Sequence, residues 1–182
     1  MNKKVPLAVL AGVLVVAAAA AFGYSAGVAA VREQFGVRGW VQVTVVRDGK
    51  VIYSYESHNL IVTQGKDIIA KQLGSTSPNT NGANYIGLST DSSSPDSSWT
   101  SIPNEITSGG LARAQGSYSH TNGTNTYQIS KTFTASASFT GVQLAGLYVT
   151  QTGNTLFAAN TFSPVNLISG DQLTVTWTIT IS

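Results

Sequence analysis

The last eleven residues, "QLTVTWTITIS" (172–182), decide the fold of this chain. The odd positions carry the apolar residues Leu173, Val175, Trp177, Ile179 and Ile181, and threonines fill the even positions from 174 to 180. Side chains of a strand alternate between its two faces, so this pattern predicts a strand with one buried face and one hydroxyl-coated face. The same five apolar residues form a candidate assembly strand, which pairs either within its own chain or with a neighbouring copy.

The composition predicts one domain with an appendage that binds no nucleic acid. Of the 182 residues 42% are hydrophobic, enough for a core, and only 10% are charged, against about 25% in an average soluble domain. The net charge is +2, and Lys3 and Lys4 supply two positive charges, so the remainder balances at 2 − 2 = 0. A duplex-binding face needs clustered Lys and Arg, and the sequence has no such cluster. The absence of cysteine excludes disulfides, thiolate metal sites and a cysteine nucleophile.

Residues 5–31 contain no charged side chain and predict a hydrophobic helix. Such a helix would span roughly 40 Å, more than the bilayer core of about 30 Å. A retained membrane anchor and a secretory signal cleaved near residues 20–26 both fit the pattern. Lys3 and Lys4 place the N-terminus in the cytoplasm and the rest outside it. The strongest part of this membrane segment contains Val5, Leu7, Leu10, Leu14 and Val16.

A third interpretation of this segment is a pilin-like helix that packs into the core of a filament. Val5 weakens it, because it follows the two lysines where a prepilin peptidase would require a small residue. Residues 32–39 form a short predicted linker to the globular domain, residues 40–182. A linker of this length would hold the domain close to any retained anchor.

Two alternating runs at the start of the domain, residues 40–46 and 51–57, predict a hairpin. They flank Asp48-Gly49, a pair typical of the type I′ turn. Residues 64–73 then predict one short helix, with Thr63 as its N-cap and Gly74 ending it in the left-handed conformation.

The rest of the domain consists of short strand patterns separated by turns. The predicted strands are 85–90, 111–120, 126–140, 142–150, 155–163, 165–169 and the terminal segment. The longest irregular stretch, residues 91–110, carries Trp99, Ile102 and Ile106, which we expect to hold it against the domain. Eight or nine short strands with one helix predict a mainly β fold, an antiparallel β-sandwich or jelly-roll-like domain.

Several of these stretches together resemble a known class of virion domain. They are "HNLIVTQGKDIIAKQLG", "YIGLST", "ISKTFTAS", "LAGLY" and "LFAANTFSPVNLISGDQLTVTWTIT". The chain resembles, over about residues 40–182, β-sandwich structural or appendage domains of tailed-phage and archaeal-virus proteins, and related uncharacterised archaeal surface proteins. The resemblance implies an all-β building block without catalysis. The hydrophobic N-terminus departs from most tail-fibre proteins and favours a membrane-containing virion or a cell-surface filament.

We therefore expect a non-enzymatic structural protein outside the cytoplasm, membrane-anchored or secreted, that acts by self-association and strand pairing. The expected partners are copies of the chain, other virion or surface proteins, and membrane lipid. One alternative is a subunit of an extracellular filament or pilus joined by donated strands. Another is a receptor- or glycan-binding module whose site lies on loops 75–84 and 91–110.

The sequence offers few candidates for chemistry, and we expect no catalytic residue, no cofactor and no metal. His58 and His120 are the only histidines, and no G-x-S-x-G nucleophile motif occurs. Asp91 and Asp96, with Glu105, are weak calcium candidates, because "DSSSPDSS" lacks the alternating carboxylates of a calcium loop. Asn122 begins the glycosylation sequon "NGT" on a predicted turn. The aromatic residues mostly alternate along strands, which predicts core and cross-strand packing.

Overall fold

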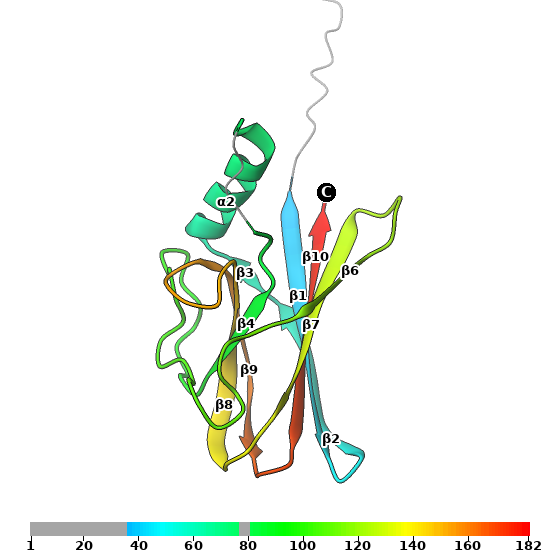
Figure 1. Ribbon diagram of the computed structural model, residues 1–182, viewed down its shortest axis with the longest axis vertical. Helices are drawn as coiled ribbons and strands as arrows, with labels where there is room; N and C mark the ends of the chain where they lie inside the picture. The colour runs from blue at the N-terminus through cyan, green and yellow to red at the C-terminus, as the bar shows by residue number, and fades with distance from the viewer. Residues whose placement is uncertain (1–35, 77–80) are drawn as a thin grey trace, which may run out of the picture. The chain divides into compact units, whose positions relative to one another are not determined.

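The computed structural model describes residues 36–76 and 81–182, so the predicted membrane segment lies outside the described residues. The chain divides into two compact units, Met1–Gln34 and Phe35–Ser182, and the described residues belong to the second. They form ten strands and one helix (Figure 1). In chain order these are β1 (Val37–Arg47), β2 (Lys50–His58), β3 (Leu60–Ile61), α2 (Thr63–Gly74), β4 (Tyr85–Ser89), β5 (Ala114–Gln115), β6 (Ser117–His120), β7 (Thr126–Thr134), β8 (Phe139–Tyr148), β9 (Leu156–Leu167) and β10 (Gln172–Ile181).

The strands form two five-stranded antiparallel sheets, which confirms the prediction of a mainly β fold. Sheet A has the order β2-β1-β10-β7-β6 and sheet B the order β3-β9-β8-β4-β5. Buried side chains from both sheets form the main hydrophobic core, and a second, smaller cluster contains Ile102, Tyr148 and Leu156. The pairing is nested along the chain, because β1 pairs with β10, β3 with β9, β4 with β8 and β6 with β7.

The terminal segment forms β10, the central strand of sheet A. It pairs with β1 along one edge and with β7 along the other, so the candidate assembly strand has both edges occupied within its own chain. The odd-numbered residues from Leu173 to Ile179 are completely buried, as the alternation predicts. On the outer face the hydroxyls of Thr174, Thr176 and Thr180 hydrogen bond to hydroxyls of β7.

The hairpin of β1 and β2 closes through the predicted turn. Asp48 has φ 49° and Gly49 has φ 74°, the left-handed pair that a type I′ turn requires. β1 begins at Val37, before the predicted start at residue 40. The reason is a pair of backbone hydrogen bonds between Gly36 and Ser182, 2.5 and 2.8 Å long, which extends the ladder to the last residue. The start and the end of the described domain are therefore neighbours.

Helix α2 confirms the predicted short helix, but both predicted caps are wrong. Val62 precedes the helix, and no side chain caps its first turn. The backbone N–H of Val62 bonds to the carbonyl of Phe157, and that of Thr63 to the carbonyl of Ser97. These tertiary contacts bind the chain as it enters the helix. At the other end Gly74 is still helical, and Ser75 is extended with φ −85°.

α2 packs tightly on β9 at its first turn. Gly65 is buried, and a Cβ atom there would overlap the carbonyl oxygen of Phe157. At the end of the helix, a Cβ on Gly74 would meet no atom within 4 Å. Glycine at position 65 therefore allows the close approach of helix and strand, a role that the sequence alone does not reveal.

The structure divides or joins the predicted strands differently in three places. The predicted strand 111–120 is divided into β5, at the edge of sheet B, and β6, at the edge of sheet A. The predicted run 126–140 is divided into β7 and β8, because residues 135–138 cross from sheet A to sheet B. The N–H of Ala135 bonds to the carbonyl of Asp171 and thereby fixes this crossing. Conversely, β9 is one strand where two were predicted, and it continues through Pro164. β3 pairs only with Ala158 and Ala159, so this proline lies where the outer edge of β9 has no ladder partner.

Candidate functional site

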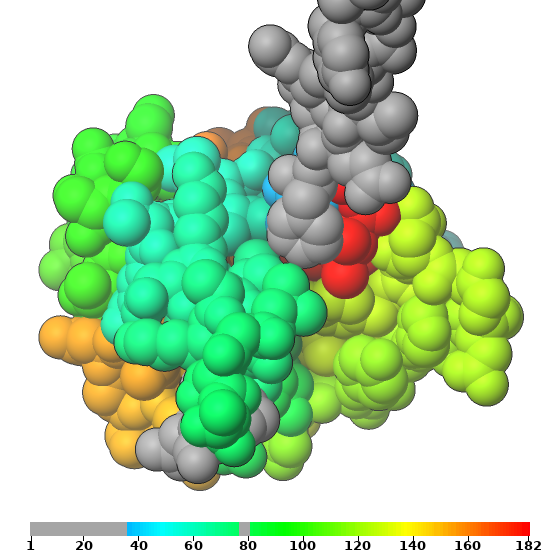
Figure 2. All heavy atoms as spheres, turned by 90° about the horizontal axis from the view of Figure 1, so that it is seen from above, coloured from blue at the N-terminus to red at the C-terminus, as the bar shows by residue number. Residues whose placement is uncertain are grey.

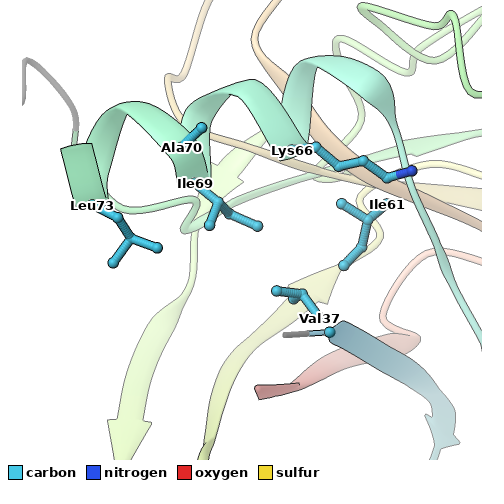
Figure 3. Close-up of a pocket in the computed structure, with 7 residues that line it drawn as sticks. Val37, Ile61, Lys66, Ile69, Ala70 and Leu73 are labelled. Carbon is cyan, nitrogen blue, oxygen red and sulfur yellow. The ribbon is translucent and has the colours of Figure 1, made fainter. Parts of the chain in front are cut away.

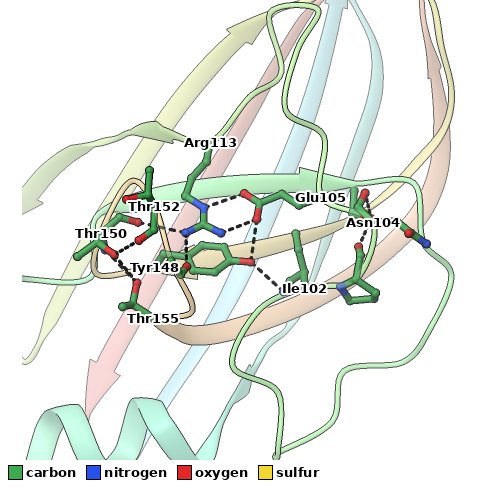
Figure 4. A network of polar contacts seen from close by, with 11 residues as sticks. Ile102, Asn104, Glu105, Arg113, Tyr148, Thr150, Thr152 and Thr155 are labelled. Carbon is green, nitrogen blue, oxygen red and sulfur yellow. Dashed lines mark hydrogen bonds and ion pairs between the residues drawn. The ribbon is translucent and has the colours of Figure 1, made fainter.

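A buried ion pair holds the long loop between β4 and β5 against sheet B (Figure 4). Arg113 Nε donates to Glu105 Oε1 at 2.7 Å, and Arg113 Nη2 donates to Glu105 Oε2. The guanidinium lies over the ring of Tyr148, with Cζ 3.4 Å from the ring centroid. The side chains of Arg113 and Glu105 are only 10% and 16% exposed, so this pair is largely shielded from water.

Tyr148 connects the ion pair to the backbone of the same loop. Its hydroxyl accepts a 2.8 Å hydrogen bond from the N–H of Ile102 and lies 3.4 Å from Glu105 Oε2. Burial raises the pKa of the Tyr148 hydroxyl, so the group stays neutral and can donate to the carboxylate. Arg113 Nη1 also donates to the carbonyls of Thr150 and Gly153, at 3.3 and 3.0 Å.

The network is a structural clamp between the loop and sheet B. Burial lowers the pKa of the Arg113 guanidinium, but the hydrogen bonds with Glu105, together with the charge of Glu105 and the contact with Tyr148, raise it overall. The two opposite charges of the ion pair compensate each other within the fold. The sequence analysis missed this pair, although Glu105 and Arg113 are the only charged residues between Asp96 and Lys131, which could have marked them as partners.

A second ion pair, Arg47–Asp171, joins the end of β1 to the turn that precedes β10. Asp171 is 1% exposed and accepts hydrogen bonds from Arg47 Nε at 2.8 Å, from Arg47 Nη2 at 2.7 Å and from the N–H of Ile168 at 2.9 Å. The bonds from Arg47 hold the pKa of the Asp171 carboxyl below its usual value, against the opposing effect of burial. Arg47 and Asp171 are 124 positions apart, a distance that concealed the pair from sequence reasoning.

The structure does not bring the calcium candidates together. Asp91 accepts from the N–H of Ser93 and from Asn104 Nδ2, and Asp96 accepts from the N–H and the hydroxyl of Ser98. The serine hydrogen bonds lower the pKa of each carboxyl, and each aspartate closes its own turn. Residues 36–76 and 81–182 contain no group of three or more His, Asp or Glu side chains that could hold a metal ion.

The histidines and the sequon lie at exposed positions. His58 ends β2, and its ring meets Trp40 edge-on at 6.4 Å between centroids. His120 ends β6, and its Nδ1 lies 2.9 Å from the carbonyl of Thr126. Within the described ranges no hydrogen bond connects either imidazole to a carboxylate. Asn122 is exposed in the turn between β6 and β7, the position at which the sequence predicts it.

An apolar hollow lies beside α2, and we call it the α2 groove (Figure 3). It consists of two adjoining hollows of about 550 and 420 Å³ that share Val37, Ile69 and Leu73. Figure 3 shows Ile69 and Leu73 projecting from the same side of the helix, with Ile69 pointing toward Val37. The second hollow extends to the ends of sheets A and B, where it is lined by Tyr127, Phe157, Ile179 and Ile181.

Large apolar side chains remain open to solvent at this groove. Leu73 is 74% exposed and Ile181 is 42% exposed. Figure 2, which looks onto this end, shows α2 and the last residues of β10 on the same face of the domain. Lys66 lines the first hollow and, together with Arg38, a neighbouring one. The groove thus combines an apolar floor with a basic rim, a combination that the sequence analysis did not predict.

Comparisons with protein-family models, with curated proteins and with solved structures gave no match for this chain. The resemblance to virion and archaeal surface domains therefore stays a prediction. The described part of the chain, which excludes residues 1–35, contains no helix that is long and apolar enough to cross a membrane. Function therefore has to be inferred from the surfaces and contacts of the domain itself.

Proposed function

We propose that this chain is a non-enzymatic structural building block of a virion or cell-surface assembly. Residues 5–31 tether the β-sandwich to a membrane or direct its export, and the domain works by contacting copies of itself and neighbouring proteins. The observation that carries this proposal is the pair of edge strands of sheet A: β2 and β6 each have one ladder partner among the described residues, so each has an edge at which another copy can pair.

The polar groups of the domain support a structural role. Two ion pairs, Arg47–Asp171 and Arg113–Glu105, are satisfied within the fold. The outer face of sheet A carries threonine and serine hydroxyls that bond to one another across β7 and β10. This ladder of hydroxyls satisfies polar groups within the fold, and within the described ranges no hydrogen bond connects a histidine to a carboxylate as in a catalytic triad.

Strand pairing between copies would use the edges of sheet A. β10 and β1 each have two partners within the chain, so donating β10 would break two ladders. β2 and β6 each have one partner, and an edge of this kind can accept a strand from another chain. The nested pairing of β1 with β10, β3 with β9 and β4 with β8 supports the jelly-roll-like description of the domain.

Purification of the full chain in detergent, followed by size-exclusion chromatography with light scattering and negative-stain imaging, tests this proposal. We expect oligomers that grow with protein concentration and repeat as rings, spikes or filaments. The proposal would be refuted if the chain stayed monomeric over the whole concentration range. It would also be refuted if the chain hydrolysed a substrate at a rate typical of enzymes.

A further inference from the structure

We propose that the α2 groove is a lipid-contacting surface, which rests against an anionic bilayer when the chain is tethered. Leu73 and Ile181 enter the interfacial layer, and Lys66 and Arg38 lie among the phosphates of the head groups. This inference rests on the proposed function, because the tether brings the groove to the membrane. It goes beyond that function by naming lipid as the partner of this surface.

The first argument is the combination of exposure and shape. A side chain such as Leu73, with 74% of its surface in water, is common on a domain surface when it stands alone. Here it borders two apolar hollows that also contain Ile69 and Ile181, so the apolar area is continuous. Continuous apolar patches mark sites of contact with proteins or membranes.

The second argument is the short chain between the apolar segment and the groove. Gly36 and Val37 line the groove, and the uncharged segment ends at Val31. Five residues span at most about 17 Å when fully extended. If the segment lies in the bilayer, the groove must therefore lie within or near the head-group layer.

The same reach disfavours a second copy as the occupant. β10 has ten residues, so the sandwich measures about 30 Å along this strand. A copy stacked end to end below the groove would need more room than the five-residue connection allows. A bilayer surface needs no such room.

The third argument is charge. Asp67 is paired with Lys71, whose Nζ lies 2.6 Å from its carboxylate, so these two charges compensate each other. Lys66 and Arg38 then give the rim a net positive charge. Basic side chains around an apolar face are the pattern of surfaces that bind anionic lipid, because their aliphatic stems reach along the apolar layer while the charges meet phosphates.

Site-specific labelling of the full chain tests the inference, since the protein has no native cysteine. L73C and the matched control S169C, in the exposed turn between β9 and β10, are each labelled with the fluorophore NBD. The proteins are reconstituted into vesicles of two parts phosphatidylcholine to one part phosphatidylglycerol. We expect NBD at position 73 to shift to the blue, to be shielded severalfold from aqueous iodide, and to be quenched by nitroxide-labelled lipid. NBD at position 169 should stay open to iodide.

The other outcomes are distinct. Equal iodide quenching at both positions would overturn the lipid inference. Shielding at position 73 without quenching by nitroxide lipid would also overturn the inference, because a protein then covers the groove. Shielding from iodide at both positions, again without quenching by nitroxide lipid, would overturn it in favour of copies joined end to end. Vesicle flotation before labelling separates the two proposals, because a chain that does not float with the vesicles contradicts the tether itself.

A charge-reversal pair tests the role of the basic rim. In the L73C background, K66E should weaken lipid quenching in the anionic vesicles and have little effect in pure phosphatidylcholine. K50E reverses an exposed lysine in the β1–β2 hairpin and should change neither value. Equal effects of K66E and K50E would contradict a specific contact between the rim and lipid phosphates.

Discussion

Strand β10 runs from the centre of sheet A to the end of the domain beside α2, and the burial of its inner face differs between these two regions. Trp177 and Ile179 lie on the inner face of β10 and are completely buried, whereas Ile181, next on the same face, is 42% exposed. The centre is covered by sheet B, and the end is covered only in part by α2, which leaves the groove. An alternating pattern therefore predicts which face a side chain is on, but not whether anything covers that face.

The buried centre of sheet A contains one polar group without a hydrogen-bond partner among the described residues, the indole N–H of Trp177. An unsatisfied buried donor costs about 1–3 kcal/mol, so the ring must be retained at this position for its volume rather than for its polarity.

Removing that volume should have the largest effect on the domain. We expect W177A to lower the free energy of unfolding by about 3–5 kcal/mol, measured by urea denaturation, because it leaves a cavity between the sheets. W177F keeps most of the ring and removes the unsatisfied N–H, so it should lose much less. I181A on the same face is the control, and a loss as large as that of W177A would show that the α2 end is closed.

The contact of α2 with β9 should tolerate no added atom. G65A should destabilise the domain by about 1–3 kcal/mol, because its methyl group would overlap the Phe157 carbonyl. G74A adds the same methyl group to the same helix in open space, where it should stabilise by up to about 1 kcal/mol. Equal responses of the two variants in urea denaturation would mean that the helix does not pack on β9 as described.

The hydroxyl of Tyr148 should be needed to hold the loop of residues 91–110 against sheet B. Y148F leaves the buried N–H of Ile102 without its acceptor, a change that should cost about 1–3 kcal/mol. Limited proteolysis should then cut within residues 91–110 faster than in the wild type. S98A, which lies in the same loop outside the clamp, should not speed up cleavage, and unchanged cleavage of Y148F would refute the role of the clamp.

The ion pair opposite the α2 end should make part of the stability depend on acid pH. The pKa of Asp171 is lowered in the folded chain, so its contribution is complete above the unfolded value of about 3.9 and is lost as pH falls through the folded pKa. The stability difference between the wild type and D171N should therefore shrink as pH is lowered from 6 to 3. A constant difference over this range in thermal unfolding would contradict the pairing with Arg47.

The smallest effect on stability is expected in the groove. L73S should change the free energy of unfolding by no more than about 0.5 kcal/mol, because most of this side chain is already in water. I69S removes a side chain that packs partly against the core, and it should cost more in the same urea experiment. A loss from L73S as large as that from I69S would mean that the groove is closed in the free chain.

Local patterns predicted much of the fold from the sequence. The alternation in β10, the Asp48-Gly49 turn and the helix after β3 all depend on neighbouring residues, and the structure confirms them. The predicted N-cap of α2 was wrong because the carbonyl of Ser97, in a distant loop, binds the backbone N–H of Thr63 at the start of the helix. Local propensity does not reveal such a tertiary contact.

The candidate sites were harder to predict for the same reason. Asp171 and Arg47 are isolated charges in the sequence, and only the pairing of β1 with β10 brings them together. The groove likewise depends on where α2 lies relative to the two sheets, which the period of its residues does not specify. The exposure of Leu73 is a property of the assembled domain, and no sequence motif marks it.

Native mass spectrometry of the full chain, released from detergent micelles over a range of concentrations, tests the central claim most directly. We expect integer multiples of the mass of a single chain, with the larger multiples gaining as the concentration rises. A single-chain mass at every concentration would contradict a building block that works by contacting its copies.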